Sequence, residues 1–347
     1  MENQEHHRRV RYNGTHPKAF REKYKELQPE KYAEDVEKVI QRGSTPAGMH
    51  RPICVKEILE ILQVAPGQTG LDATLGYGGH TLEILKCLNH NGFLYAVDVD
   101  PLELPRTRAR LADLGFGSDT IKIQQLNFSN IDKIVEESGP LDFVLADLGV
   151  SSMQIDNPER GFSFKKDGPL DLRLNPQKGI SAAERLKLCS TDELRGMLTE
   201  NSDEPHAEQI SRAVISALKK GQPISTTKQL EGIIADALKF IPERERKDEI
   251  KKSCQRCFQA LRIDVNNEFE VLYEFLEKLP EALAAGGRIA ILSFHSGEDR
   301  LVKKSFKQFF REGIYREIAP DPIRPSPEEC SSNSRARSAK LRWAIKA

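Results

Sequence analysis

Residues 69–88, TGLDATLGYGGHTLEILKCL, have the pattern of a short buried strand, a glycine-rich turn and a helix. Apolar stretches of alternating strand-like and helix-like character follow at residues 92–100, 107–115, 120–128, 131–137 and 141–149. Strands and helices that alternate at this spacing form βαβ units, in which the strands run parallel. The sequence therefore predicts an α/β fold with a mostly parallel sheet that is covered by helices on both faces.

The alternation stops after residue 150. A loop rich in glycine and proline comes next, followed by segments with helical periodicity up to about residue 279. Strand-like patterns return at 286–294 and 340–347. The predicted organisation is a polar N-terminal extension at 1–48, a sheet domain at 49–150 and 280–347, and a helical insertion at 151–279.

The composition excludes several classes of protein. The chain of 347 residues is 38% hydrophobic, has no apolar run near the ~18 residues of a membrane span, and begins with a polar stretch, so we expect a globular cytoplasmic protein without a membrane anchor. The 52 Lys and Arg residues balance 52 Asp and Glu residues, which argues against bulk electrostatic binding of a polyanion. Residues 331–347 nevertheless hold five basic residues and no acid, so local phosphate contacts are compatible with neutrality.

Six cysteines are scattered along the chain, which is typical of reduced thiols rather than of a disulfide framework. Only Cys254 and Cys257 form a C-x-x-C pair. A structural zinc site needs two more ligands at similar spacing, and the sequence has no second pair of this kind. We expect two thiols on a helix and no metal site.

The glycine-rich turn predicts a nucleoside-binding site. Glycines there let the backbone approach a ligand, and Asp98, at the end of the second strand, is placed to accept hydrogen bonds from ribose hydroxyls. A dinucleotide and S-adenosylmethionine are the two candidate cofactors. Asp72, Asp98 and Asp147 form an acidic rim that suits a sulfonium cation, which favours S-adenosylmethionine. Phe128 is placed to stack on an adenine, or else to fill the core.

The fourth strand ends at Asp147, which is followed by Ser151 and Ser152. An acid at this position faces the cofactor and is able to accept the N–H hydrogens of an exocyclic amine while methyl transfer proceeds. A cap on the following turn is the structural alternative for Asp147. His295, at the end of the fifth strand, is either a substrate contact or a filler of the strand end. Next to it, Ser296 and Asp299 have the spacing of a helix-capping pair.

Residues 157–173, NPERGFSFKKDGPLDLR, combine glycines, aromatic side chains and charges. Phe162 and Phe164 could stack on a base, while Arg160 and Lys165 hold phosphates, as in proteins that bind single strands. A lid packed by its own aromatic side chains is the alternative interpretation.

Several of these segments resemble one known family, in the same order and at similar spacing. They are HRPICVKEIL, LDATLGYGGH, LADLGVSSMQIDNPERGFSFKKDGPLDLRL, CFQALRIDVNNE, GGRIAILSFHSGEDRLVK and NSRARSAKLR, and they closely resemble the bacterial RsmH (MraW) family. The resemblance implies a class I S-adenosylmethionine-dependent methyltransferase with a Rossmann-like sheet and a helical substrate-recognition insertion. It implies N4-methylation of a cytidine in 16S ribosomal RNA of the small subunit, near the decoding centre.

The resemblance also implies site residues. The cofactor contacts would be Gly78, Gly79, His80, Asp98, Phe128, Asp147 and Gln154. The catalytic candidates are Asp147, Ser151, Ser152 and His295. The substrate contacts would be Arg160, Phe162, Phe164, Lys165, Arg173, Arg256, Arg335 and Arg337.

The chain departs from the family pattern in four places. Residues 252–257 read KSCQRC where the family has His, Pro and Thr, residues 201–206 read NSDEPH, Gly297 replaces a Leu, and the N-terminal extension at 1–48 is not typical of the family. These changes leave open a paralogue that acts on a different cytosine. An S-adenosylmethionine-dependent enzyme that methylates a protein amide or amine, a dinucleotide-dependent oxidoreductase and a non-catalytic RNA-binding factor are also compatible with parts of the pattern. The turn lacks the G-x-G-x-x-G pattern, which counts against the oxidoreductase.

Overall fold

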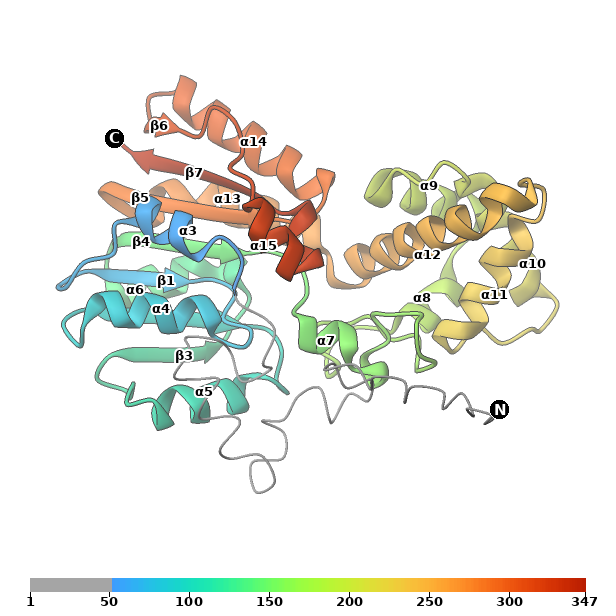
Figure 1. The fold of residues 1–347 in the computed structure, drawn as a ribbon, viewed down its shortest axis with the longest axis horizontal. Helices are drawn as coiled ribbons and strands as arrows, with labels where there is room; N and C mark the ends of the chain where they lie inside the picture. The colour runs from blue at the N-terminus through green and yellow to red at the C-terminus, as the bar shows by residue number, and fades with distance from the viewer. Residues whose placement is uncertain (1–51) are drawn as a thin grey trace, which may run out of the picture. The chain divides into compact units, whose positions relative to one another are not determined.

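A seven-stranded sheet organises the computed structural model, which describes residues 52–347 (Figure 1). The predicted extension at 1–48 lies outside the described residues. The strand order is β3-β2-β1-β4-β5-β7-β6; β1 to β5 are parallel, and β7 is antiparallel to both of its neighbours. The strands are β1 (Thr69–Asp72), β2 (Phe93–Asp98), β3 (Ile121–Gln125), β4 (Leu141–Asp147), β5 (Leu283–Ser293), β6 (Tyr315–Ile318) and β7 (Lys340–Lys346). The predicted mostly parallel α/β sheet is confirmed.

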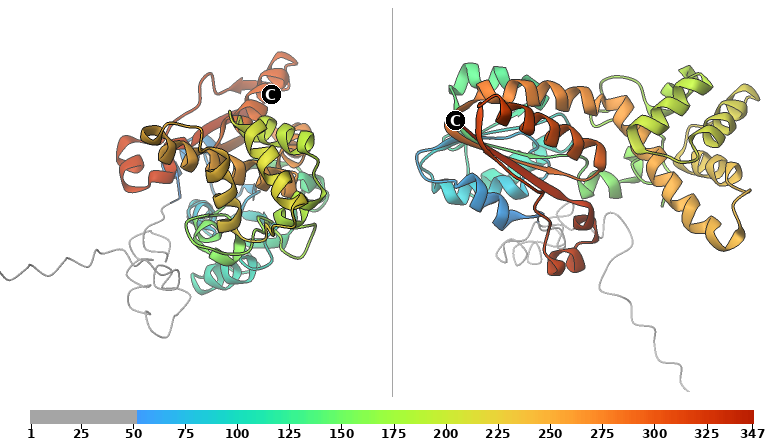
Figure 2. Two further views of the ribbon diagram at one scale, coloured as in Figure 1. Left: turned by 90° about the vertical axis from the view of Figure 1, so that its right-hand side faces the viewer. Right: turned by 90° about the horizontal axis from the view of Figure 1, so that it is seen from above.

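Two apolar layers cover the sheet, because successive side chains of a strand point to opposite faces. On β4, Phe143 and Leu145 join one cluster, while Val144 and Ala146 join the other. The helices that supply the first layer are α3 (Val55–Leu62), α4 (Gly79–Leu88) and α5 (Leu104–Asp113). Those of the second layer are α6 (Ile131–Ser138), α13 (Glu268–Ala282) and α14 (Ser296–Arg311) (Figure 2).

The insertion between β4 and β5 has an apolar core of its own, whose fully buried members all lie between residues 170 and 261. Its helices are α8 (Ala182–Leu188), α9 (Thr191–Ser202), α10 (Ala207–Lys219), α11 (Thr227–Ala237) and α12 (Glu243–Asn266). Three of them begin with reciprocal capping boxes, in which a Ser or Thr and a Glu or Gln three residues later satisfy the free N–H groups of the first turn.

Helix α13 packs on the sheet rather than in the insertion. Its Leu272, Phe275 and Leu279 are buried in the cluster that also contains Val144 of β4. We therefore propose that the insertion ends near Asn267, between α12 and α13, and not at residue 279. None of the helices between residues 52 and 347 is both long enough and apolar enough to cross a membrane.

Candidate active site

Three aspartates lie at the carboxyl edge of the parallel strands. Asp72 ends β1, Asp98 ends β2 and Asp147 ends β4. Strand β1 is paired with both β2 and β4, so the chain order reverses direction beside it. Open α/β sheets bind ligands at the carboxyl ends of their strands near such a reversal. The predicted acidic rim is therefore assembled at the position where a ligand is expected.

The glycine-rich turn between β1 and α4 is fixed by its backbone. Gly76 and Gly78 both have positive φ, which glycine adopts without steric cost. The Gly76 N–H donates to Asp98 Oδ2 at 2.7 Å, and Thr107 Oγ1 donates to the Gly76 carbonyl at 2.7 Å. A Cβ at Gly79 would stand 2.5 Å from Pro52 Cγ, so packing explains this glycine. The turn is thus held against the end of β2.

Asp98 accepts one backbone N–H on each carboxylate oxygen, from Gly76 at 2.7 Å and from Asp100 at 2.9 Å. Its pKa is raised to about 6, mainly by burial and with a smaller contribution from the carboxylates of Asp100 and Asp72, although the two hydrogen bonds oppose this shift. Each oxygen keeps further acceptor capacity. These features suit a group that would accept the hydroxyls of a ribose.

Asp147 has one engaged and one unengaged carboxylate oxygen. Its Oδ2 lies 3.5 Å from Nδ1 of His80, whose Nε2 is hydrogen-bonded to the Ile53 carbonyl at 2.9 Å. Its Oδ1 is buried and has no hydrogen-bond partner among residues 52–347. Burial raises the Asp147 pKa to about 6, and His80 opposes this shift. A buried carboxylate oxygen without a donor is costly, so the geometry calls for a ligand that donates to it.

The other predicted cofactor contacts lie close to these groups in the fold. Phe128 begins a short 3-10 helix after β3, is half-buried, and packs edge-to-face on Phe275 with ring centres 5.1 Å apart. Gln154 lies in α7 (Ser152–Asp156) and is buried. Its Oε1 accepts the Ser151 N–H and its Nε2 donates to Asp100 Oδ2. The contacts of Phe128 and Gln154 with a cofactor stay predictions.

The catalytic candidates other than Asp147 mainly shape helix ends. Ser151 is the N-cap of α7, in a capping box with Gln154. His295 is the N-cap of α14: its Nδ1 accepts the Glu298 N–H, and its Nε2 lies 3.1 Å from Glu298 Oε1. Ser151 and His295 therefore cap helices, and a catalytic role for either of them or for Ser152 stays a prediction.

The predicted capping pair of Ser296 and Asp299 is wrong, because His295 already caps α14. Instead, the Asp299 carboxylate accepts a hydrogen bond from Nε of Arg342 at 2.6 Å and another from Nζ of Lys340 at 2.8 Å. Both donors lie on β7. Gly297, which departs from the family pattern, lies against an aromatic ring: a Cβ there would stand 2.5 Å from Phe269 Cζ.

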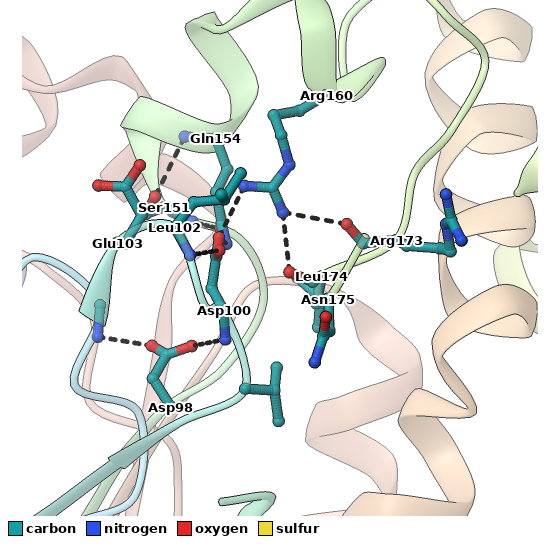
Figure 3. Close-up of polar contacts among 12 residues, drawn as sticks. Asp98, Asp100, Leu102, Glu103, Ser151, Gln154, Arg160, Arg173, Leu174 and Asn175 are labelled. Atoms are coloured by element: carbon teal, nitrogen blue, oxygen red, sulfur yellow. Dashed lines mark hydrogen bonds and ion pairs between the residues drawn. The ribbon is translucent and has the colours of Figure 1, made fainter. Parts of the chain in front are cut away.

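The structure overturns the predicted phosphate contact of Arg160. Its guanidinium is buried and donates from Nη1 to Asp100 Oδ2 at 2.7 Å (Figure 3). Nη2 donates to the carbonyls of Arg173 and Leu174. A buried guanidinium with these partners is not available to RNA, and its acid, Asp100, is a residue that the sequence patterns did not single out.

Phe162 and Phe164 are half-buried and pack against the core of the insertion. The Phe164 ring lies 5.4 Å from the ring of Phe258 on α12, and the Arg160 guanidinium lies 5.6 Å from the Phe162 ring centre. These contacts favour the alternative of a lid packed by its own aromatic side chains. Stacking on a base stays a prediction for their exposed edges.

Three of the other predicted substrate contacts are held in ion pairs. Arg173 donates from two nitrogens to both carboxylate oxygens of Asp171, Arg335 donates to Asp156, and Arg256 lies between Glu204 and Glu249. The two that remain, Lys165 and Arg337, are exposed, and their contact with RNA stays a prediction.

Two of the departures from the family pattern meet in space. Glu204, which belongs to the altered segment 201–206, is buried. Its carboxylate accepts a hydrogen bond at 2.9 Å from Oγ of Ser253, which belongs to the altered segment 252–257 on α12. Arg256 lies 3.6 Å from Glu204, and His206 lies 3.7 Å from Glu249. The altered residues Glu204 and Ser253 therefore contact one another inside the insertion, beside Arg256, which the family pattern retains.

The thiols of Cys254 and Cys257 are both buried on α12, and burial raises the Cys254 pKa to about 12. Without a metal ion, such thiols stay protonated at neutral pH. Within residues 52–347, one group could chelate a cation: the ligand atoms of Glu268, His295 and Glu298 lie within 4.8 Å of one another. However, Arg262 donates to both carboxylate oxygens of Glu268, so a positive charge already neutralises this group.

We compared the chain with known protein families and with curated proteins. The model of the MraW methylase family matches residues 47–347. The chain belongs to the MraW methylase family. "Ribosomal RNA small subunit methyltransferase H 2" of Alkaliphilus metalliredigens is 77% identical over 98% of this chain and 97% of its own length. "Ribosomal RNA small subunit methyltransferase H 1" of Lachnoclostridium phytofermentans is 69% identical over 100% and 95%. "Ribosomal RNA small subunit methyltransferase H" of Acidobacterium capsulatum is 38% identical over 86% and 98%.

Membership of the MraW methylase family confirms the predicted family, the class I methyltransferase sheet and S-adenosylmethionine as the cofactor. The residues present fit this cofactor. The turn at Gly76 and Gly78 has positive φ and lies beside Asp98, and Oδ1 of Asp147, which has no partner among residues 52–347, is suited to face a cationic or N–H-bearing group. The individual contacts stay predictions.

The raised pKa values predict how the MraW methylase site responds to pH. Asp98 and Asp147 have pKa values of about 6 in the folded chain, against 3.8 for the free side chain. Their protonated forms therefore stabilise the fold below about pH 4, and this contribution is lost as the pH rises through 6. Over the same interval ionised Asp147 begins to attract a sulfonium cation.

We therefore expect the affinity for S-adenosylmethionine, relative to uncharged S-adenosylhomocysteine, to rise by up to about tenfold per pH unit below pH 6 and then to level off. Titration calorimetry of both ligands from pH 5 to 8 measures this ratio. Asp147→Asn should flatten the curve. A ratio that is constant with pH in the unmodified protein would contradict the assignment.

Proposed function

We propose that this protein transfers the methyl group of S-adenosylmethionine to N4 of a cytidine in 16S ribosomal RNA of the small subunit, near the decoding centre, in the cytoplasm. The names of relatives up to 77% identical support a ribosomal RNA substrate. The observation that carries the chemistry is Oδ1 of Asp147 at the end of β4, which has no hydrogen-bond partner in the described part of the chain. The resemblance to the RsmH (MraW) family supports N4 of cytidine as the acceptor.

S-adenosylmethionine would supply an electrophilic methyl group, to be held by the glycine-rich turn and Asp98. Asp147 would then orient the amine that is methylated and act as the general base. Its Oδ1 accepts an N–H of the exocyclic amine, which turns the amine lone pair toward the methyl group. The same carboxylate takes up the proton released when the N–C bond forms.

Two neighbours hold Asp147 in place for this role. His80 lies 3.5 Å from Oδ2, so Oδ1 is the oxygen left for the substrate. Thr74 Oγ1 accepts the Asp147 N–H at 2.6 Å, which ties the end of β4 to the turn after β1. The target cytosine must leave its stack to reach this edge of the sheet, at a cost of a few kcal/mol in a duplex. A loop or single-stranded target is therefore the expected substrate.

A paralogue that methylates a different RNA cytosine is the second candidate. The observation in its favour is the cluster of buried Glu204 and Ser253 with half-buried Arg256, because Glu204 and Ser253 replace residues of the family pattern in the insertion proposed to recognise RNA. The cluster lies inside the insertion rather than at the strand ends, so it would alter which RNA binds and leave the methyl-transfer groups unchanged. An amide or amine of a protein is the third acceptor to test.

The test is transfer from radiolabelled S-adenosylmethionine to small ribosomal subunits from cells that lack this protein. We expect label that is sensitive to nuclease and resistant to protease, and mass spectrometry should locate it as N4-methylcytidine near the decoding centre. Subunits from cells that contain the protein are the control and should take up little label. Label at another cytosine would favour the paralogue, and label released by protease would favour a protein acceptor. Cofactor binding without transfer to any RNA would refute the proposal.

A further inference from the structure

One buried ion pair joins the cofactor edge of the sheet to the loop that follows η3 (Pro158–Arg160). The side chains of Arg160 and Asp100 are 6% and 1% exposed, and Nη1 of Arg160 lies 2.7 Å from Asp100 Oδ2. The other end of the same guanidinium, Nη2, donates to the carbonyls of Arg173 at 3.0 Å and Leu174 at 2.8 Å (Figure 3). One planar group therefore binds both segments.

On the sheet side, Asp100 is hydrogen-bonded directly to Asp98, the residue predicted to bind the ribose of the cofactor. The Asp100 N–H donates to Asp98 Oδ1 at 2.9 Å, and Asp98 Oδ2 accepts the Gly76 N–H. Asp100 itself is held by the Leu102 N–H and by Nε2 of Gln154. A ligand that binds Asp98 or the glycine-rich turn would therefore affect the position of Asp100, the carboxylate that holds Arg160.

On the loop side, the backbone is strained. Leu172 is buried and has φ of +65°, in the left-handed region that a leucine rarely adopts. Its N–H donates to the Arg160 carbonyl at 3.2 Å, and its carbonyl accepts Nδ2 of Asn266 at 2.8 Å. Asn266 Oδ1 also accepts the Leu174 N–H. Such a conformation persists only where its surroundings over-determine it, and strain of this kind concentrates at ligand-binding and switch regions.

We propose that Arg160 is a positioning residue that couples cofactor binding at the β2 end to the arrangement of residues 171–174, and through them to RNA binding. This coupling rests on the proposed function for the identity of its two ligands. This role requires the planar guanidinium of an arginine, which donates to the Asp100 carboxylate and to the carbonyls of Arg173 and Leu174 at the same time. A lysine ammonium would keep the positive charge opposite Asp100 but could not bind all three acceptors.

The test compares Arg160→Lys with Arg185→Lys. Arg185 donates from Nε to Asp264 at 2.8 Å inside the insertion and, among residues 52–347, its side chain forms no hydrogen bond or ion pair with Asp100 or with 171–174, so it is a control for the same chemical change. RNA affinity is measured with and without S-adenosylhomocysteine, and the affinity for S-adenosylhomocysteine is measured with and without RNA. Coupling must appear as the same factor in both directions.

We expect S-adenosylhomocysteine to tighten RNA binding by about tenfold in the unmodified protein and in Arg185→Lys. Arg160→Lys should reduce this factor to below about twofold and lower kcat on the order of tenfold, while leaving the affinity for S-adenosylhomocysteine alone unchanged. Asn266→Ala releases the same loop without touching the ion pair and should reproduce the loss of coupling, which covers the case in which Arg160→Lys does not fold.

Coupling that survives in Arg160→Lys or in Asn266→Ala, or that is absent from the unmodified protein, would overturn the proposal. The binding measurements involve no turnover. If the unmodified protein shows coupling but methylates no RNA, the proposed function fails and the coupling stands.

Discussion

Asp147→Asn is expected to lower kcat for methyl transfer by about 10³-fold. The amide has nearly the shape of the carboxylate, so the contact with His80 should persist, and the Asp147 backbone N–H should keep its hydrogen bond to the Thr74 hydroxyl. An amide is a weaker acceptor and cannot take up the proton of the reacting amine. Single-turnover transfer to small ribosomal subunits measures the chemical step, and the affinities for RNA and for S-adenosylhomocysteine should stay within a few-fold of the unmodified protein.

Asp142→Asn is the matched control, because Asp142 lies on the same strand, far from the carboxyl edge, and accepts the Thr69 N–H at 2.8 Å. This variant should transfer methyl groups at close to the normal rate. If Asp147→Asn retained a tenth or more of the normal kcat, the catalytic role of Asp147 would be wrong. Loss of RNA binding in the same variant would point to a structural role instead.

Gly161→Ala is expected to disable the loop that follows η3. Gly161 has φ of +72°, and a Cβ there would stand 2.2 Å from the Pro169 carbonyl oxygen and 2.9 Å from the Asp171 nitrogen. The backbone on one side must move, and that displaces Asp171 and the residues after it. A misplacement of about 1 Å in a residue that positions the substrate can lower the rate by about 100-fold. We therefore expect kcat/KM for RNA to fall by about 100-fold, while calorimetry shows nearly unchanged binding of S-adenosylhomocysteine.

Gly179→Ala separates the effect of conformation from that of contact. Gly179 has φ of +70°, but no atom of residues 52–347 outside its immediate neighbours lies within 4 Å of a Cβ at this position. Its variant should lose only about 1–2 kcal/mol of stability to the left-handed backbone and keep its activity. Equal losses of activity in the two variants would show that backbone strain, and not the close approach to Pro169, explains Gly161.

The sheet was predictable from the sequence because its signals are local. The glycine-rich turn and the buried strands of the first half carry their own periodicity and turn chemistry, and the structure has β1, β2, β3 and β4 where the patterns indicate. The late strand at 340–347 was also found, as β7. Helix α12 was harder to recognise, because the first turns of its 24 residues are almost entirely charged.

The partners of charged side chains were not predictable. Arg160 has the sequence context of a phosphate ligand, between a 3-10 turn and two phenylalanines, yet its partner Asp100 is 60 positions away in the chain. Only the fold brings the two together. The Asp-Val-Asp sequence at 98–100 was a usable signal, because a second acid directly after a ligand-binding strand end often needs a buried partner.

The placement of the insertion also has a consequence for folding. Strands β4 and β5 are neighbours in the sheet, yet the chain leaves at Asp147 and returns at Leu283. Closing a loop of this length costs about 4 kcal/mol of chain entropy before any pairing is gained. The insertion has an apolar core of its own, so we expect it to collapse first and shorten the span that must close. The pairing of β4 with β5 would then be the late, rate-limiting event, and the edge that carries Asp147 would be completed last.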